Sequence, residues 1–379
     1  MTRIHIPFAR RPLQAAATLA LGASAALAQA QTAPADSSVQ VFGALAASAV
    51  HTSHQAVGAG SRVVSGPWSP SLLGVRGSEA LGNGLSASFR FEGSVDPANG
   101  AGGRTVLNTA KFWDRAAWVG IGADTWTLTA GRQLHAGIDR IATTLDLFQA
   151  NGDGKLLLST LALNATNSFG GFDTRVDDAL KLRVQGAGWS GGLSRAQASA
   201  GRVGTSQSAD VGYQGTSFGA GAYLLRYHSD GNALAQKTWG LGGNVAAGPA
   251  RVYAHYMQAR HDKRVGGRLA QQDDQVIGLG VALPLSSSFT VKAAYYRDSG
   301  SAVGGVGGRD GQRSTVALQG DYALSRRTSL LFGAFHNTLS GAFAADPTSL
   351  SVLGLIDPAT RSISGHASTG IAVGVQHRF

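Results

Sequence analysis

The chain is 379 residues long and carries a formal net charge of +10, yet charged residues make up only 14% of it. Its 53 glycines are spread evenly, and this composition is unusual for a soluble enzyme of this size. No cysteine is present, so the stability of the fold must come from a source other than disulfides. A basic chain could bind nucleic acid, but the N-terminal residues have the pattern of an export signal, so we expect no nucleic-acid partner.

The first 30 residues have the organisation of a secretory signal peptide. Three arginines precede an apolar run over Ala15–Ala28, and small-residue cleavage sites end at Ala28 and Ala30. This run is too short to cross a bilayer as a helix. Without the leader, 29 basic residues face 22 acidic ones, a net charge of about +7. We therefore expect residues 31–379 to form the folded domain.

Short segments with β-type alternation follow one another from residue 38 to the C-terminus. They predict sixteen strands, near 38–51, 71–81, 84–94, 112–121, 125–132, 177–187, 192–199, 208–215, 218–228, 237–247, 250–260, 274–284, 289–298, 314–323, 328–339 and 368–379. Seven tight connections, such as Gly82-Asn83 and Gly248-Pro249, alternate with eight long ones. All tight connections then lie at one end of the structure together with both termini, an asymmetry typical of an outer-membrane barrel with short periplasmic turns and long external loops.

The two faces of the predicted strands differ in the way that such a barrel requires. In the last strand Ile371, Val373 and Val375 alternate with small residues, and in the sixth strand leucines alternate with Lys181 and Arg183. One row can face lipid and the other a wet lumen, and only a closed barrel pairs every backbone group of its strands within the bilayer. The predicted fold class is all-β: a sixteen-stranded antiparallel transmembrane β-barrel.

One connection, from Gln133 to Thr174, is far longer than most loops in compact domains. It is too apolar for a disordered segment, because it includes Leu145, Leu147 and Phe148 among other large hydrophobic residues. Three aspartates, Asp139, Asp146 and Asp153, are interspersed. This composition favours a loop packed against another part of the molecule.

Several motifs occur in order and at consistent spacing over the whole mature chain. They are Ser38-Val39-Gln40-Val41-Phe42-Gly43, the segment from Leu73 to Leu85 across the first tight turn, Arg115 to Gly120 followed by Ala130-Gly131-Arg132-Gln133, Asp146-Leu147-Phe148, and the terminal Phe379. In these the chain resembles the trimeric, sixteen-stranded general-diffusion porins of Gram-negative outer membranes, in particular the anion-selective branch. The resemblance implies an outer-membrane location, a homotrimer in contact with lipid and lipopolysaccharide, and passive diffusion of small anionic or neutral solutes.

The resemblance also implies that the third external loop, residues 133–174, folds into the barrel and narrows it. In the family a cluster of wall arginines faces that loop, and Arg115 and Arg175 match two of its positions. A third position holds Leu72 here, and Arg76, Arg90 or Arg132 could compensate for it in part. The aspartates of the loop would edge the opening, with Asp146 facing Arg115 and Arg175.

The candidate constriction residues are therefore mostly basic: Arg90, Arg115, Arg132, Arg175, Lys181 and Arg183 against Glu92, Asp139, Asp146 and Asp153. Low-dielectric walls focus the field of such charges, and the majority sign sets the ion preference. We expect anions to be favoured. The alternative for each arginine is an ordinary solvated charge at a strand end, Arg132 could instead anchor the base of the loop, and Asp139 and Asp153 could be turn or cap residues.

No catalytic residue, cofactor or metal site is expected. The segment Gly188-Trp189-Ser190-Gly191-Gly192 matches the G-x-S-x-G elbow of hydrolases, but that motif needs a strand–turn–helix context and here falls in a predicted tight turn. The histidine pairs His51/His54 and His255/His261 have no carboxylates at metal-ligand spacing. Two alternatives remain open from sequence: a plugged barrel that acts as an adhesin or structural protein, and an outer-membrane hydrolase.

Overall fold

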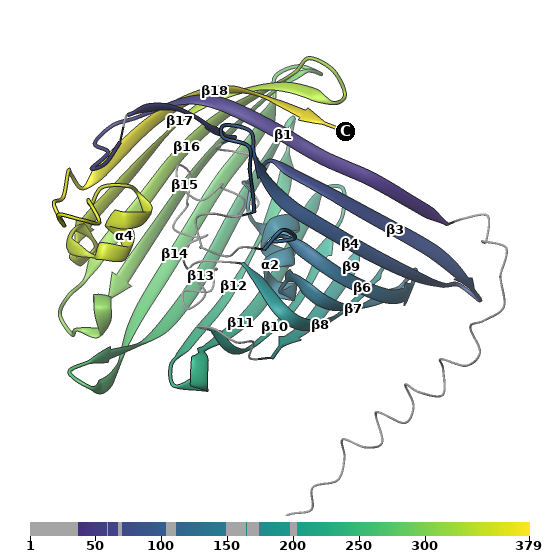
Figure 1. Ribbon diagram of the computed structural model, residues 1–379, viewed down its shortest axis with the longest axis horizontal. Coiled ribbons are helices and arrows are strands. Elements are labelled where there is room, and N and C mark those ends of the chain that lie inside the picture. The colour runs from purple at the N-terminus through teal and green to yellow at the C-terminus, as the bar shows by residue number, and fades with distance from the viewer. Residues whose placement is uncertain are drawn as a thin grey trace, which may run out of the picture.

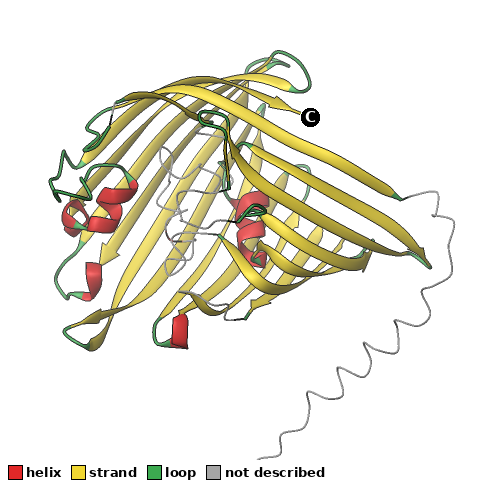
Figure 2. Ribbon diagram, viewed as in Figure 1, coloured by secondary structure: helices red, strands yellow, loops and turns green. Residues whose placement is uncertain are grey.

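The computed structural model describes residues 37–58, 60–66, 70–103, 111–148, 164, 174–197 and 203–379. They form a closed barrel of tilted antiparallel strands (Figures 1 and 2). The sixteen barrel strands are β1 (Ser38–Thr52), β3 (Leu72–Gly82), β4 (Leu85–Asp96), β6 (Ala116–Ala123), β7 (Trp126–Leu134), β8 (Arg175–Gly186), β9 (Trp189–Ala196), β10 (Val203–Gln214), β11 (Phe218–Ser229), β12 (Ala235–Ala247), β13 (Ala250–Val265), β14 (Arg268–Pro284), β15 (Phe289–Ser301), β16 (Gly311–Ala323), β17 (Thr328–Gly341) and β18 (Ala367–Arg378). Two short strands, β2 (Ser61–Ser65) and β5 (Ala101–Gly102), lie in the first two long connections.

The barrel closes where the two ends of the chain meet. Strand β1 pairs with β18 over Ala44–Thr52 and with β3 over Ser38–Ala44. At the seam the backbone amides and carbonyls of Gly43 and Phe379 exchange two hydrogen bonds, each 3.1 Å long. The terminal phenylalanine is therefore part of the closure, and both ends of the described chain lie on the side of the tight turns (Figure 1).

Strand β2 follows the same path along β1 as β3 does. Ala47 is opposite Ser65 in β2, whereas Ala44 is opposite Leu72 in β3, so the strand beside this edge of β1 is interrupted between β2 and β3. The Ser71 hydroxyl bridges the interruption, since it accepts from the Ala46 amide at 2.8 Å and donates to the Ala46 carbonyl at 3.0 Å. The sequence did not predict this split.

All sixteen predicted strands and all seven predicted tight turns are present, so the predicted fold class is confirmed. Several predicted boundaries are wrong by three to six residues: β6 begins at Ala116 and not at 112, β9 at Trp189 and not at 192, β10 at Val203 and not at 208, and β14 at Arg268 and not at 274. The connection expected over residues 261–273 is mostly strand, because β13 and β14 continue to a turn at Gly266 and Gly267, both with positive φ. The polar residues of this segment predict a loop, but they belong to the paired hairpin of β13 and β14.

The two faces of the strands separate as predicted. Leu180 and Leu182 of β8 point outward and are 58% and 38% exposed, whereas Lys181 and Arg183 between them point into the lumen, where they meet the long loop. In β18, Ile371 and Val373 are exposed on the outside and Ala372 is buried. An apolar outer surface and a polar inner one are what a membrane barrel with a wet lumen needs.

The long connection between β7 and β8 folds into the barrel (Figures 1 and 2). Its helix α2 (Ala136–Arg140) and the π-helical turn η2 (Ile141–Leu145) pack against the inner wall of β9–β13. The apolar residues of this segment join wall residues in one core: Ile138, Ile141, Leu145 and Leu147 from the loop with Tyr223, Leu225, Tyr227, Met257, Val276 and Tyr296 from the strands. The expected packing of the loop against the inner wall is thus observed over residues 135–148. Most of residues 149–173 lie outside the described part of the chain.

The remaining helical turns lie in the long connections at the opposite end from the termini: η3 (Asp230–Asn232), η4 (Val303–Gly305), η5 (Ala342–Ala345) and α4 (Pro347–Val352). Asp346 caps α4 by accepting a hydrogen bond from the Ser349 amide at 2.8 Å. Val303, Phe343, Leu350 and Leu355 form a second apolar core among these connections. No helix in the described ranges is long and apolar enough to span a membrane.

Candidate functional site in the barrel lumen

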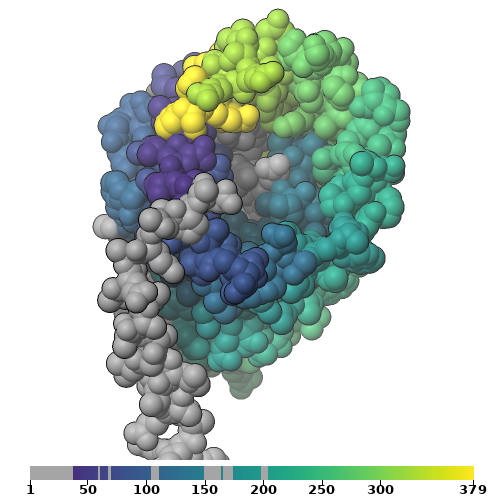
Figure 3. Space-filling model, turned by 90° about the vertical axis from the view of Figure 1, so that its right-hand side faces the viewer, coloured from purple at the N-terminus to yellow at the C-terminus, as the bar shows by residue number. Residues whose placement is uncertain are grey.

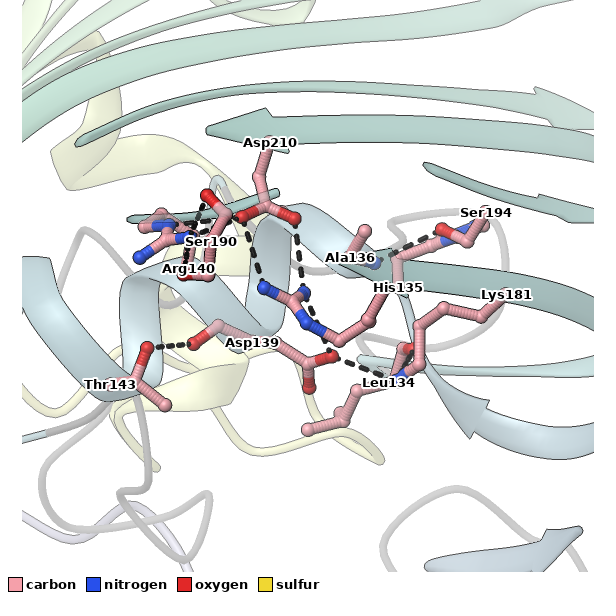
Figure 4. Close-up of polar contacts among 12 residues, drawn as sticks. Leu134, His135, Ala136, Asp139, Arg140, Thr143, Lys181, Ser190, Ser194 and Asp210 are labelled. Carbon is pink, nitrogen blue, oxygen red and sulfur yellow. Dashed lines mark hydrogen bonds and ion pairs between the residues drawn. The ribbon is translucent and has the colours of Figure 1, made fainter. Parts of the chain in front are cut away.

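The start of the inward loop is fixed to the wall by a buried histidine and three serines. The two ring nitrogens of His135 hydrogen-bond the hydroxyls of Ser194 and Ser206, at 2.8 and 2.9 Å. The backbone amide of Ala136 donates to the Ser194 hydroxyl (Figure 4), and that of Gly137 donates to the Ser208 hydroxyl. Burial lowers the pKa of His135 to about 3, so the ring is neutral near pH 7 and its two nitrogens act as one donor and one acceptor.

A buried ion pair holds the end of α2. The Arg140 side chain is 2% exposed and its Nε donates to Asp210 at 2.9 Å, while Nη2 donates to the carbonyl and hydroxyl of Ser190 (Figure 4). Gly212 and Gly221 make this approach possible, because a Cβ at either position would lie 2.8 Å from an Arg140 atom. Small residues on two wall strands therefore leave the space that one loop arginine fills.

Asp139, one residue earlier, points away from this pair and toward β8. Lys181 Nζ lies 2.7 Å from its carboxylate, and Arg183 Nη1 lies 3.5 Å from it. Arg183 also contacts Asp210 at 3.0 Å, so it links the two carboxylates. Its side chain remains 26% exposed in the lumen, unlike that of Arg140.

A second group of charges lies on β4 and at the start of β6. Glu92 is buried and takes ion pairs from Arg90 and from Arg115, the latter at 2.5 Å. The register places Arg90 directly opposite Arg76 of β3, and both guanidinium groups lie over the ring of Phe42, at 4.7 and 5.2 Å. The Arg76 guanidinium donates to the Gln40 side chain. Arg76 and Arg90 are thus on one lumenal face, where sequence reasoning placed them as partial substitutes for the arginine missing at Leu72.

A third group lies at the base of the loop. Arg132 Nη1 contacts Asp177 at 2.8 Å, its Nε donates to the Asp114 carbonyl, and Lys111 also pairs with Asp177. These contacts tie β7, β8 and the end of the preceding connection together, which is the anchoring role considered for Arg132. Arg175 is buried beside them at the first position of β8.

These ion pairs do not balance. Within these three groups seven cations share four carboxylates, a surplus of three positive charges among the paired residues. The cations are Arg90, Lys111, Arg115, Arg132, Arg140, Lys181 and Arg183, and the carboxylates are Glu92, Asp139, Asp177 and Asp210. Figure 3 looks into the barrel from the end with the termini and shows its mouth hollowed. A surplus of one sign in such an enclosed space favours ions of the other sign.

The other end of the described loop lies on the opposite wall. Asp146 is buried and accepts a hydrogen bond of 2.5 Å from the Tyr296 hydroxyl of β15. Further along, Asn164 donates to Asp298 at 2.9 Å and accepts from Arg313 at 3.2 Å. Asp153 lies outside the described residues. The described part of the loop therefore follows the inner wall from β9 to β15, with contacts to basic residues at its start and to polar wall residues farther along.

The remaining sequence candidates have other environments. Ser190 of the elbow-like motif lies in strand β9 after the turn, and its hydroxyl binds Arg140, so the strand–turn–helix context of a nucleophile elbow is not present there. His255 of the lumenal wall hydrogen-bonds the Tyr223 hydroxyl at 3.0 Å. Among the residues described, no group of three or more histidine, aspartate or glutamate side chains could hold a metal ion.

The family model described as Gram-negative porin matches residues 15–342. The chain belongs to the Gram-negative porin family. This porin is 25% identical to the outer membrane porin protein 32 of Delftia acidovorans over 379 residues, which cover 94% of this chain and 98% of that protein. Among solved structures it superposes on an anion-selective porin from Comamonas acidovorans with a TM-score of 0.71 and 23% identity, covering 91% of this chain and 100% of that one.

A second structure, OmpT of Vibrio cholerae, matches with a TM-score of 0.66 at 12% identity, covering 90% of this chain and 98% of that one. At this identity the match shows a shared fold. The porin is thus an outer-membrane protein whose barrel forms a diffusion channel, and it is not an enzyme.

Sequence reasoning missed three residues that position the loop: His135, Arg140 and Asp210. His135 follows directly on a strand and had no assigned partner, while Arg140 and Asp210 are 70 residues apart. A signal for the ion pair was available in the inward positions of β10, where Asp210 is followed by Gly212. Its partner could be found only from the fold.

Proposed function

We propose that this porin is an anion-preferring channel for small hydrophilic solutes, and that the basic wall of β4–β8 and the inward loop form its selective zone. The observation that carries the proposal is that seven cations share four carboxylates in three ion-paired groups. The name of the structural relative, an anion-selective porin, supports it.

Not every cation in the network contributes equally to the field in the lumen. Arg140 is buried against Asp210, and its charge is largely cancelled there. Arg90, with 35% of its side chain exposed, and Arg183, with 26%, are in contact with lumen water and act directly on passing ions. The candidate constriction residues remain Arg90, Arg115, Arg132, Arg175, Lys181 and Arg183, with Asp139 and Asp146 on the loop, and among these cations Arg90 and Arg183 are the most exposed to the lumen.

The cluster of Arg90, Glu92 and Arg115 tests whether lumenal charge sets the anion preference, because a cation and the carboxylate can be removed in separate variants. Arg90→Gln removes an exposed positive charge and leaves Arg115 paired with Glu92. Glu92→Gln removes the carboxylate and frees both cations. We expect the chloride-to-potassium permeability ratio to change by roughly two- to fivefold in opposite directions, lower for Arg90→Gln and higher for Glu92→Gln.

The measurement is the reversal potential of each purified variant in planar bilayers under a potassium chloride gradient. Arg327→Gln, in the exposed turn between β16 and β17, removes the same type of charge outside the lumen and is the matched control. If Arg90→Gln and Arg327→Gln shift the potential equally, the proposal that local lumenal charge sets the preference fails.

We further propose that the porin is a homotrimer assembled through the outer face of β1, β3, β4 and β6. Val39, Val41, Val119 and Ile121 on this face are between 50% and 73% exposed, and a groove of about 780 Å³ runs beside them. Trimeric forms of a structural relative support this assembly. Cross-linking of the purified protein should give a three-subunit product, and Val119→Arg should abolish it.

A further inference from the structure

The lumenal wall of the first barrel strands carries a row of polar and aromatic side chains. Arg76 of β3 is opposite Gln40 of β1 on one side and Arg90 of β4 on the other. Trp118 of β6 is in turn opposite Arg90. Residues that face each other in this way have their side chains on the same face of the sheet. That face is the lumenal one, because Val119, next to Trp118, is 59% exposed on the outside.

A parallel row of serines lies one step nearer the end of the barrel that holds the termini. Ser78 is opposite Ser38 on one side and Ser88 on the other, and the hydroxyls of Ser38 and Ser78 are 3.3 Å apart. The N-terminal strands, purple and dark blue in Figure 3, form one side of the barrel mouth at this end. The two rows together line a pocket of about 200 Å³. Because the termini and tight turns are periplasmic, the pocket belongs to the periplasmic part of the lumen.

The two arginines of the first row are incompletely neutralised. Nε and Nη2 of Arg90 donate to Glu92. In the described ranges the Arg76 guanidinium donates only to the neutral side chain of Gln40, at 3.0 and 2.8 Å. Both guanidinium groups lie within 5.2 Å of the centre of the Phe42 ring. Like charges directly opposite each other on neighbouring strands are destabilising, so an anion bound between these two arginines would offset their repulsion.

The indole ring of Trp118 offers a flat surface beside the arginine pair. The residue is half-buried, and within the part of the chain that the structure describes no ring contact or hydrogen bond engages its side chain. Trp239, in contrast, packs on Tyr256 and donates its N–H to Gln258 at 3.0 Å. A tryptophan that is withdrawn from water usually has a partner for its N–H. Both the ring face and the N–H of Trp118 are therefore available to a ligand.

The size and charge of the pocket restrict the class of ligand. Its volume of about 200 Å³ is below the roughly 300–1,000 Å³ of sites for drug-sized molecules, so it holds about one six-membered ring. Glu92 already neutralises Arg90, which leaves Arg76 with about one positive charge for the ligand. A carboxylate, with one negative charge, fits this charge better than a phosphate ester with nearly two.

The other lining groups select for hydroxyls on the same ligand. The three serine hydroxyls donate and accept hydrogen bonds, and so does the Gln40 amide. The face of an aromatic ring such as that of Trp118 binds the apolar face of a second ring. A hydroxylated ring that carries one carboxylate satisfies all of these groups at once.

We propose that this pocket binds a sugar acid of one ring, a hexuronate. The carboxylate lies between Arg76 and Arg90, the hydroxyls bind the serine row, and the sugar ring lies against Trp118. The proposal rests on the proposed channel function, because the solute reaches the pocket through the lumen. The site shares Arg90 with the selective zone and extends from there toward the periplasm: Arg76 is four residues, about 13 Å, farther along β3 than Leu72.

The test measures how glucuronate reduces the conductance of the purified porin in planar bilayers at constant potassium concentration. We expect saturable block by glucuronate, and no such block by glucose, which lacks the carboxylate. Acetate, which has the charge but no ring, should also fail to block. Cyclohexanecarboxylate, which has the ring and the charge but no hydroxyls, should require about tenfold higher concentrations than glucuronate.

Two substitutions test the two ends of the ligand. Arg76→Gln removes the cation and should raise the half-blocking concentration of glucuronate about tenfold, while Trp118→Leu should raise it roughly fivefold. The matched controls lie outside the lumen: Arg327→Gln in an exposed periplasmic turn, and Trp189→Leu, whose ring is 59% exposed on the outer face. Both controls should leave the block unchanged. Conductance in potassium chloride alone shows that each variant is folded.

Four results would overturn the proposal. Equal block by glucuronate and acetate would show that charge alone acts. Equal block by glucuronate and cyclohexanecarboxylate would show that the serine row does not read hydroxyls. Tighter block by glucose 6-phosphate would assign the site to a phosphorylated sugar, and an unchanged half-blocking concentration for both Arg76→Gln and Trp118→Leu would place the block elsewhere.

The same recordings separate this site from the anion preference. An anion-selective wild type that glucuronate does not block would contradict only the sugar-acid site. A cation-selective wild type that glucuronate blocks in the expected way would contradict only the proposed anion preference. Trp118→Leu changes no charge and should leave the reversal potential in a potassium chloride gradient unaltered.

Discussion

Arg140 and Arg183 contact the same carboxylate, Asp210, but replacing Arg140 should lower the stability of the barrel, whereas replacing Arg183 should lower its anion preference. Arg140 is 2% exposed and makes hydrogen bonds to Asp210, Ser190 and Thr144. Arg140→Ala removes one partner of a buried pair, a change that typically costs about 3–5 kcal/mol. Because Arg183 remains on Asp210, we expect a loss of about 3 kcal/mol, at the lower end of that range.

Arg183→Ala leaves Asp210 paired with the buried Arg140, and its own side chain is 26% exposed to lumen water. Such partly solvated pairs contribute about 1 kcal/mol or less to stability. This variant should therefore keep its stability and lose part of its anion preference. Arg140→Ala should instead release the end of α2, lower the thermal midpoint and broaden the distribution of single-channel conductance.

Thermal unfolding in detergent and single-channel recording in bilayers measure both quantities on the same preparations. Arg327→Ala, in an exposed turn, is the control for loss of a cation. Equal destabilisation by Arg140→Ala and Arg183→Ala, or an unchanged midpoint for Arg140→Ala, would refute the division into a buried anchor and a conducting charge.

Three other changes test separate parts of the structure. Arg175→Gln should lower the chloride-to-potassium permeability ratio, by roughly twofold, in the reversal-potential assay; no shift would remove Arg175 from the selective zone. Burial lowers the pKa of His135 from 6.5 to about 3, so between these values the unfolded chain binds a proton that the folded barrel does not. The contribution of His135 to stability should be constant above pH 6.5 and fall below it, by up to about 1.4 kcal/mol per pH unit, and His135→Asn should make the pH dependence of thermal unfolding shallower by that amount. Gly131 has a φ of +125°, and a Cβ there would lie 2.2 Å from the Ala117 carbonyl; Gly131→Ala should cost roughly 1–3 kcal/mol, whereas Gly102→Ala, with open space around it, should leave the thermal midpoint unchanged.

The barrel itself was predictable because period-two alternation and turn residues are local signals. The rows of Leu180 and Lys181 show on which face each side chain lies, and the tight turns fix the register of each hairpin. The split between β2 and β3 was not predictable, since it depends on hydrogen bonds between the Ser71 hydroxyl and the backbone of Ala46 in the neighbouring strand β1. The extension of the β13–β14 hairpin was not predictable either, because its outer part is polar like a loop and is held by the pairing of the two strands.

The candidate site was predictable in composition but not in detail. The excess of arginine and lysine over aspartate and glutamate is visible in the sequence, and so is an apolar loop that must pack inward. Which cation meets which carboxylate is set by the tertiary fold: Lys181 reaches Asp139 across 42 residues, and Tyr296 reaches Asp146 across 150. Pairings at such separations have no periodic signature in the chain.

The reversal potential of the wild-type porin in a potassium chloride gradient tests the central claim most directly. Three uncancelled positive charges in the ion-paired wall network should make chloride more permeant than potassium, so the potential should have the sign of an anion-selective channel. A potential of the opposite sign would contradict the account, because it would show that carboxylates rather than these arginines and lysines control the narrow zone.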